Sequence, residues 1–442
     1  MVRAGMPHGP RIATIALTAC ACVLATGCIL LQVAEDQAKD AALVRLKGTV
    51  SAVEPGDGAR VVVLTRRPAL GEPEDAIVDY YTRETDGVFY FAVLQPGVYS
   101  LAAFQDRNGN LVYDRGEPGL NSSDATTFVM PAGDTREGIE LVIHPDDRIP
   151  TENDGGYDIR AFVAEAAAAG NATTARHLAA LGDVVDLSDP RFGAKNGSRS
   201  LWEAWDFIFE GLQGIYFLEP YDPDRTPVLF VHGISGHPQQ FSTLIDRLDR
   251  ERYQPWFFFY ASGEHLPKTA QLLVQLIQDL HMEHGFDRMV LVAHSMGGLL
   301  SRDFLLQHRE AMGRDAISTF ISISTPWGGN AAADAGVARS PVVVYAWEQM
   351  ATRGEYIRAL FYEDPETQKI NRRLPEGTTH HLIFGFVDGS PSDGVVAIAS
   401  ELHAPAQAQA TSIYGVKASH AEILHHDLTV ERVAALLADA PR

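Results

Sequence analysis

Residues 289–300 have the sequence Met-Val-Leu-Val-Ala-His-Ser-Met-Gly-Gly-Leu-Leu. An apolar run ends at a polar residue, Ser295, and an amphipathic segment follows at once, which predicts a buried strand that turns sharply into a helix. A serine at such a corner has unusual backbone angles, and neighbouring backbone comes so close that small residues are needed two positions before and after it. Ala293 and Gly297 occupy these positions. The corner would expose the Ser295 hydroxyl and direct the first free N–H groups of the helix at any group bonded to it.

The pattern Ala-x-Ser-x-Gly in this stretch resembles the nucleophile elbow of α/β-hydrolases, with alanine in the first glycine position. Residues 227–236, Pro-Val-Leu-Phe-Val-His-Gly-Ile-Ser-Gly, predict a second buried strand, which ends in His-Gly. Both motifs resemble those of bacterial lipases and esterases, and the Thr-Pro-Trp-Gly-Gly turn at 325–329 is similar to hydrolases related to inositol deacylases. The resemblance implies an α/β-hydrolase fold over residues 201–442, with a mainly parallel sheet covered by helices on both faces.

A nucleophilic Ser295 needs a base, and the base needs an acid that holds its tautomer. Hydrolases of this fold supply these groups in the chain order serine, acid, histidine. Asp393, in Asp-Gly-Val-Val, matches the acid motif of the family, and Asp388, nearer the end of an expected strand at 381–386, is the alternative. His420 lies between the expected last strand and last helix, so it is the predicted base.

Other histidines are rivals for the role of base. His425 and His426 fall where the last helix is already starting, and His403 is close to Asp393 in sequence. His232 precedes the serine in the chain, so we expect it to shape its loop.

The resemblance also implies two backbone donors for an oxyanion. They are the N–H groups of Ile234, which follows His-Gly, and of Met296, which follows the nucleophile. A side chain at Gly233 would obstruct the approach of this backbone to the substrate carbonyl. Loss of one such donor typically reduces the rate about 100- to 1,000-fold, because charge develops on the oxygen only in the transition state.

The N-terminus resembles the signal peptide of a bacterial lipoprotein. Two arginines precede an apolar run at 12–24, which is too short to span a membrane, and Ala25-Thr26-Gly27 then precede Cys28. The resemblance implies a signal peptide at 1–27 and an exported protein held to a membrane through an acylated Cys28. Ile29 in the next position indicates the outer membrane. An ordinary secretory signal is the alternative.

The chain has 442 residues, enough for two domains. After a spacer at 28–42, short alternating runs at 43–145 predict a small antiparallel β-sandwich. The run at 97–101 resembles modules of the transthyretin-like or carboxypeptidase-regulatory type. A linker and helical segment is expected at 146–200, and a cap over the active site at 330–375. The formal net charge of −21 argues against nucleic acid as a partner.

One loop of the N-terminal module has the spacing of a calcium site. Its candidate ligands at positions 1, 3, 5, 9 and 12 are Asp106, Asn108, Asn110, Asp114 and Glu117. Leu111, however, replaces the glycine that makes the sharp turn, and the flanks resemble strands rather than helices. A hairpin loop that satisfies its own backbone explains the same residues. Calcium is therefore a side hypothesis, and otherwise we expect no metal and no cofactor.

These features predict a serine hydrolase that cleaves carboxylic esters, with a lipid or acylglycerol-like molecule as substrate. An acyltransferase would use the same triad with a different acceptor. A non-catalytic surface lipoprotein on a hydrolase scaffold is the second alternative. The three predicted residues Ser295, Asp393 and His420 favour the enzyme.

Overall fold

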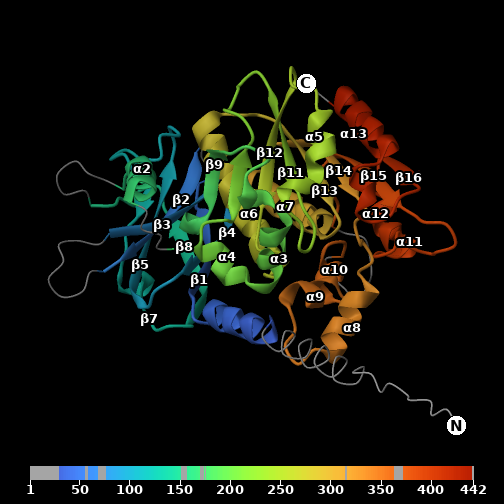
Figure 1. The fold of residues 1–442 in the computed structure, drawn as a ribbon. Coiled ribbons are helices and arrows are strands. Elements are labelled where there is room, and N and C mark those ends of the chain that lie inside the picture. Colours follow the sequence, from blue (N-terminus) through green and yellow to red (C-terminus); the bar gives the residue numbers. More distant parts are fainter. Residues whose placement is uncertain are drawn as a thin grey trace, which may run out of the picture.

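The computed structural model of the protein is shown in Figure 1. It describes residues 29–54, 58–67, 76–150, 157–169, 174, 176–313, 316–362 and 372–440. The predicted signal peptide at 1–27 and the predicted lipidation site Cys28 lie outside the described residues.

A mainly parallel sheet forms the centre of the C-terminal domain. In the described part of the chain it has eight strands in the order β16-β15-β14-β13-β11-β12-β10-β9, and of their pairings only that between β10 and β12 is antiparallel. The strands are β9 (Ala180–Val184), β10 (Gly214–Phe217), β11 (Thr226–Val231), β12 (Tyr253–Phe259), β13 (Met289–His294), β14 (Ile317–Ile323), β15 (Thr379–Gly385) and β16 (Ser412–Val416).

Helices cover both faces of this sheet. α6 (Leu266–His284) and α7 (Met296–Met312) pack on one face, and α5 (Ser242–Asp246) and α13 (Asp427–Asp439) pack on the other. Successive side chains of a strand point to opposite faces, so Leu229 belongs to the first core and Phe230 to the second. A strand buried on both faces reads as a nearly continuous apolar run, which is how β11 and β13 appear in the sequence. The predicted α/β fold class is confirmed.

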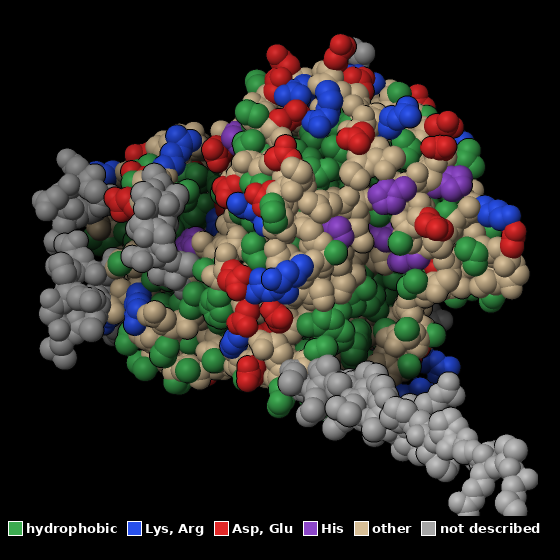
Figure 2. Space-filling model, viewed as in Figure 1, with side chains coloured by type: hydrophobic (Ala, Val, Ile, Leu, Met, Phe, Trp, Pro, Cys, Tyr) green, Lys and Arg blue, Asp and Glu red, His purple; other side chains and the backbone are tan. Residues whose placement is uncertain are grey.

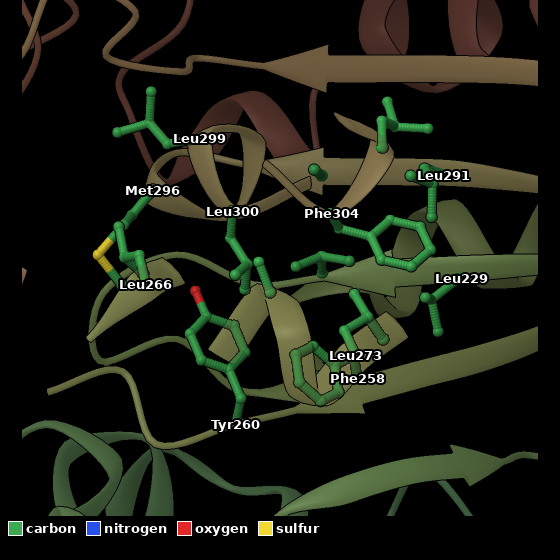
Figure 3. Close-up of a cluster of buried hydrophobic side chains, with 14 of the residues drawn as sticks. Leu229, Phe258, Tyr260, Leu266, Leu273, Leu291, Met296, Leu299, Leu300 and Phe304 are labelled. Carbon is green, nitrogen blue, oxygen red and sulfur yellow. The ribbon is translucent and has the colours of Figure 1, made fainter. Parts of the chain in front are cut away.

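The apolar core beneath α7 is formed by side chains of α7, of α6 and of the sheet. Figure 3 shows Leu300 and Phe304 of α7 gathered with Phe258 of β12 and Leu273 of α6. All four side chains are fully buried. This packing holds the N-terminus of α7, and therefore the Ser295 corner, firmly against the ends of the strands.

The N-terminal module consists of two small sheets packed on one another through an apolar core. One has the order β4-β1-β8, and the other contains β3-β2-β5-β6 with β7 beside β5. The strands are β1 (Val44–Ala52), β2 (Ala59–Arg66), β3 (Ala76–Arg83), β4 (Gly87–Val93), β5 (Gly97–Asp106), β6 (Gly119–Leu120), β7 (Thr127–Met130) and β8 (Thr135–Ile143). The pairings are antiparallel except for β1 with β8, which is parallel and departs from the expected antiparallel arrangement.

Two segments contain secondary structure that their composition does not predict. Residues 29–41, in the expected spacer, form a helix whose Val33 and Asp36 are buried. β9 lies in the expected linker and helical segment, so the large sheet begins before residue 201. That segment also contains α2 (Ile159–Ala169) and most of α3 (Ala194–Trp202). β9 was difficult to predict because it is short, only partly buried and contains Gly182 with a φ of 79°.

The described residues also contain six shorter helices. They are α4 (Ala204–Phe209), α8 (Ala331–Arg339), α9 (Tyr345–Met350), α10 (Glu355–Ala359), α11 (Ile398–Glu401) and α12 (Ala404–Gln407). None of the helices in the described ranges is long and apolar enough to cross a membrane. On the face shown in Figure 2, the Lys and Arg side chains are interspersed with those of Asp and Glu.

Candidate active site

Ser295 lies at the corner between β13 and α7, with φ 55° and ψ −129°. A left-handed φ is unfavourable for a residue with a side chain, and such strain is concentrated at functional sites. A Cβ atom on Gly297 would overlap the carbonyl oxygens of Val231 and His232. This close approach of α7 to β11 explains the need for glycine two positions after the serine.

The structure brings Ser295, His420 and Asp393 together in one hydrogen-bonded chain. His420 Nε2 lies 2.9 Å from Ser295 Oγ, and His420 Nδ1 lies 2.5 Å from Asp393 Oδ2. A carboxylate can only accept, so Nδ1 carries the proton and Nε2 is free to accept from the serine hydroxyl. Ser295 comes from the β13–α7 corner, Asp393 from the loop after β15 and His420 from the loop after β16.

Asp393 is fully buried behind His420. Its Oδ1 accepts hydrogen bonds from the backbone N–H groups of Val395 at 2.9 Å and Val396 at 2.7 Å. Burial acts to raise the pKa of Asp393, but the hydrogen bond and charge of His420 and these two donors outweigh it and lower the pKa below its ordinary value. The site therefore keeps Asp393 ionised, as an acid that orients a histidine must be.

The rival acid and bases have other contacts. Asp388 forms an exposed ion pair with Lys417 at 2.5 Å. The ring of His403 packs against Phe361, with ring centroids 5.5 Å apart. His425 Nδ1 lies 2.7 Å from Thr243 Oγ1, and His426 accepts from Leu428 N at the start of α13. The geometry separates these residues from the predicted set.

The two predicted oxyanion donors flank Ser295. Met296 is the first residue of α7, where the N–H groups lack partners within the helix. Ile234 follows Gly233, and a Cβ on Gly233 would lie only 2.7 Å from Ser295 Cβ. The backbone after β11 therefore passes directly beside the serine. The roles of Ile234 and Met296 as donors stay a prediction.

Glu401 was missed by the sequence reasoning. It lies in α11, is fully buried, and its Oε1 is 3.3 Å from the backbone nitrogen of Gly385, the last residue of β15. Burial, and then the negative charge of Asp393, raise the pKa of Glu401 to about 8. Nothing in the local sequence distinguishes this glutamate from one on a surface helix.

Side chains of the candidate calcium loop accept hydrogen bonds from the backbone of the same loop. Asp106 accepts from the N–H groups of Gly109 at 2.8 Å and Leu111 at 2.9 Å, and Glu117 accepts from those of Arg107 and Asp114. Leu111, which replaces the turn glycine, has a φ of 56°. Asn108 and Asn110 donate to Asp114 at 2.7 and 2.9 Å. These hydrogen bonds are those of the self-satisfied hairpin loop, and calcium binding stays a prediction.

The expected cap at 330–375 contains α8, α9 and α10, while its residues 363–371 lie outside the described part. Arg302 of α7 connects this segment to the domain. Its buried guanidinium donates to the carbonyl oxygens of Leu360 at 2.9 Å and Arg372 at 2.8 Å, and it lies 4.2 Å from the centroid of the Phe361 ring. The segment is thus fixed to α7, the helix that directly follows Ser295.

Comparison with known proteins gives a match to the part of the chain that contains Ser295. Residues 261–338, which include the Ser295 corner, match the family model of lecithin:cholesterol acyltransferase. The described residues from 180 to 440 form an α/β-hydrolase domain. A stretch of 64 residues, 14% of this chain, is 42% identical to phosphatidylcholine-sterol acyltransferase of Gallus gallus. That stretch spans only 15% of the length of the chicken protein.

Several solved structures are similar at low identity. The mature form of Bacillus licheniformis lipase BlEst2 is 19% identical, with 50% of this chain and 97% of that chain covered and a TM-score of 0.41. Aspergillus fumigatus lipase B is 16% identical, with 51% and 56% covered and a TM-score of 0.39.

Proposed function

We propose that the protein is a serine hydrolase that cleaves carboxylic esters through an acyl-enzyme on Ser295. The observation that carries the proposal is the chain of hydrogen bonds from Ser295 through His420 to the buried Asp393. A nucleophile, a base with its tautomer defined and an ionised orienting acid are the groups that acyl transfer requires.

In this mechanism His420 Nε2 takes the proton as Ser295 Oγ attacks the ester carbonyl. Asp393 stabilises the imidazolium that forms, and the N–H groups of Ile234 and Met296 bind the negative oxygen of the tetrahedral intermediate. The alcohol leaves with the proton from His420. Water, activated by the same imidazole, then releases the acid and restores the serine. The steps need no cofactor.

The substrate class in this proposal is a lipid or acylglycerol-like ester. Its support is the match of residues 261–338 to a family named for acyl transfer from lecithin to cholesterol, together with the apolar residues of the cap. The same match favours a second candidate, an acyltransferase, in which an alcohol replaces water in the last step. Product analysis with and without an added long-chain alcohol or sterol separates the two activities.

For its location in the cell, we propose that the protein is an exported lipoprotein, anchored to the outer membrane through acylated Cys28. The resemblance of residues 25–28 to a lipoprotein cleavage site supports this location. Cys28→Ser should release the protein from the membrane fraction and abolish incorporation of labelled fatty acid. Retention of the label would contradict the assignment.

The test of the enzyme assignment is Ser295→Ala, assayed on p-nitrophenyl esters of short and long acyl chains. We expect loss of hydrolysis and loss of labelling by a fluorophosphonate, with the thermal unfolding temperature close to that of the wild type. Ser301→Ala, which removes a buried hydroxyl from α7, the helix that follows Ser295, is the matched control and should keep its activity and labelling. An active Ser295→Ala variant would show the proposed nucleophile to be wrong.

A further inference from the structure

The peptide that joins Gly233 to Ile234 is the unit that presents one proposed oxyanion donor. The carbonyl oxygen of Gly233 and the N–H of Ile234 belong to the same planar peptide and point in opposite directions. Any group that fixes the carbonyl of Gly233 therefore also fixes the direction of the Ile234 N–H. The surroundings of Gly233 O decide whether this donor is held in place before a substrate arrives.

His232, the residue before Gly233, makes the decisive contact. Its ring is fully buried, with Nδ1 2.7 Å from Gly233 O and Nε2 3.2 Å from the backbone nitrogen of Tyr260. The Tyr260 N–H can only donate, so Nε2 must be the accepting nitrogen of a neutral ring. The proton is then on Nδ1, which donates to Gly233 O. Burial lowers the pKa of His232 to about 3, so the ring stays neutral at ordinary pH.

Further contacts hold this ring and this carbonyl. The Tyr260 ring stacks on the His232 ring with centroids 4.2 Å apart, and the Tyr260 hydroxyl donates to His232 O at 2.8 Å. Gly233 O accepts a second hydrogen bond, from Gly236 N at 3.0 Å. A rotation of the Gly233–Ile234 peptide away from Ser295 would have to break both bonds to Gly233 O. It would leave a buried imidazole donor without a partner, which is costly.

We propose that His232 is a positioning residue of the oxyanion site: its Nδ1–H donates to Gly233 O and so holds the Ile234 N–H toward the oxygen that becomes negative at Ser295. The inference rests on the proposed serine hydrolase function. His232 does not touch the reacting atoms. It acts by preorganisation, which matters because a donor already in place needs no reorganisation when charge develops.

Two amide variants separate the two nitrogens of His232. The amide nitrogen of Asn takes the place of Nδ1 and can still donate to Gly233 O, whereas the amide of Gln takes the place of Nε2 and can still contact Tyr260. We expect His232→Asn to keep kcat within about threefold of the wild type, and His232→Gln to reduce kcat about 10- to 100-fold, below the full loss of an oxyanion donor. KM should change little in both, because the ester ground state depends less on this donor.

The inhibition constant for a trifluoromethyl ketone is a measurement that a general loss of packing would not change. Ser295 Oγ adds to its carbonyl carbon, the proton passes to His420, and the hemiketal oxygen carries the negative charge. The inhibition constant for this ketone should rise in His232→Gln by the same factor by which kcat/KM falls, and it should stay near the wild-type value in His232→Asn.

His380→Gln is the matched control for replacing a buried histidine of the sheet. His380 is also almost fully buried, in β15, with Nε2 2.9 Å from Ser322 Oγ, and it belongs to neither the triad nor the oxyanion loop. We expect it to keep kcat and ketone affinity. Should His232→Gln not fold, as judged by thermal unfolding, His232→Leu takes its place in the comparison.

The outcomes are distinguishable. Equal kcat and equal ketone affinity in His232→Gln and the wild type would overturn the positioning role and leave the hydrolase assignment intact. An equal loss in His380→Gln would also overturn it, because the effect would then be one of packing. A wild-type protein that neither hydrolyses esters nor binds a fluorophosphonate at Ser295 would overturn both proposals.

Discussion

The Nε2 atom of His294 lies 2.8 Å from the carbonyl oxygen of His420. A carbonyl oxygen can only accept, so the His294 ring donates this hydrogen bond to the backbone of His420, the proposed base. Burial, and then the charge of His420, lower the pKa of His294 to about 3. The contact therefore persists as a neutral N–H donor, and it connects the end of β13 to the loop after β16.

We expect His294→Leu to lower kcat about tenfold, because a small displacement of a reacting group has a large effect on rate. His294→Gln should restore most of the loss, since its amide nitrogen can occupy the place of Nε2. Steady-state kinetics on a p-nitrophenyl ester measures both variants. An unchanged kcat in His294→Leu would mean that the His420 loop needs no support from this contact.

The second prediction decides between the two candidate acids. Asp393→Asn should reduce kcat by about 10⁴-fold, because an amide at this place favours the wrong tautomer of His420. Asp388→Asn should leave kcat within about twofold, because this carboxylate is exposed and pairs with Lys417. The fluorophosphonate labelling rate of the two variants should follow the same order. A larger effect at Asp388 would reverse the assignment.

Much of the site could be predicted because the residues carry positional signals. Ser295 follows an apolar strand and is flanked by small residues, and Asp393 and His420 follow in the chain order that the fold uses. Glu401, His294 and the tautomer of His232 carry no such signal, since their roles depend on contacts between segments far apart in sequence. Short elements such as β9 were missed for a related reason. Their few residues are ordered by the sheet edge and not by a periodic pattern of their own.

The third prediction concerns pH and Glu401. Its folded-state pKa of about 8 lies above the ordinary value of 4.5, so between these values the folded chain holds a proton that the unfolded chain releases. The free energy of unfolding should therefore fall as pH rises from about 5 to 8, by at most about 1.4 kcal/mol per pH unit from this group. Glu401→Gln removes this contribution, so its stability should depend less on pH.

Urea unfolding at several pH values from 5 to 8 measures the difference between wild type and Glu401→Gln. Glu264→Gln is a useful companion, because burial and then the negative charge of Asp40 raise the pKa of Glu264 to about 8 as well. The two variants should each flatten the pH dependence. Parallel curves for wild type and Glu401→Gln would show that the carboxyl group titrates normally in the folded protein.

The last prediction concerns the attachment of the N-terminal module to the hydrolase domain. Arg176 is buried between them and donates to Asp79 of β3 at 3.2 Å, to Tyr80 O at 2.7 Å and to Asp279 of α6 at 2.5 Å. Tyr80 Oη also donates to Asp279, at 2.7 Å. The two carboxylates come from different domains, and the guanidinium compensates the charge of both.

Arg176→Met should lower the free energy of unfolding by about 3–5 kcal/mol, because it leaves two carboxylates close together in a buried place without their cation. Arg191→Met is the control: Arg191 pairs with Asp189 at 3.2 Å on the surface, and its loss should cost less than about 1 kcal/mol. Urea unfolding followed by far-UV circular dichroism, which reports both domains, and by tryptophan fluorescence, which reports the C-terminal domain, measures both variants. If Arg176→Met unfolds at the same urea concentration as Arg191→Met, the buried pair does not hold the domains together. If the module instead separates at a lower urea concentration than the hydrolase domain, two transitions should replace one in Arg176→Met alone.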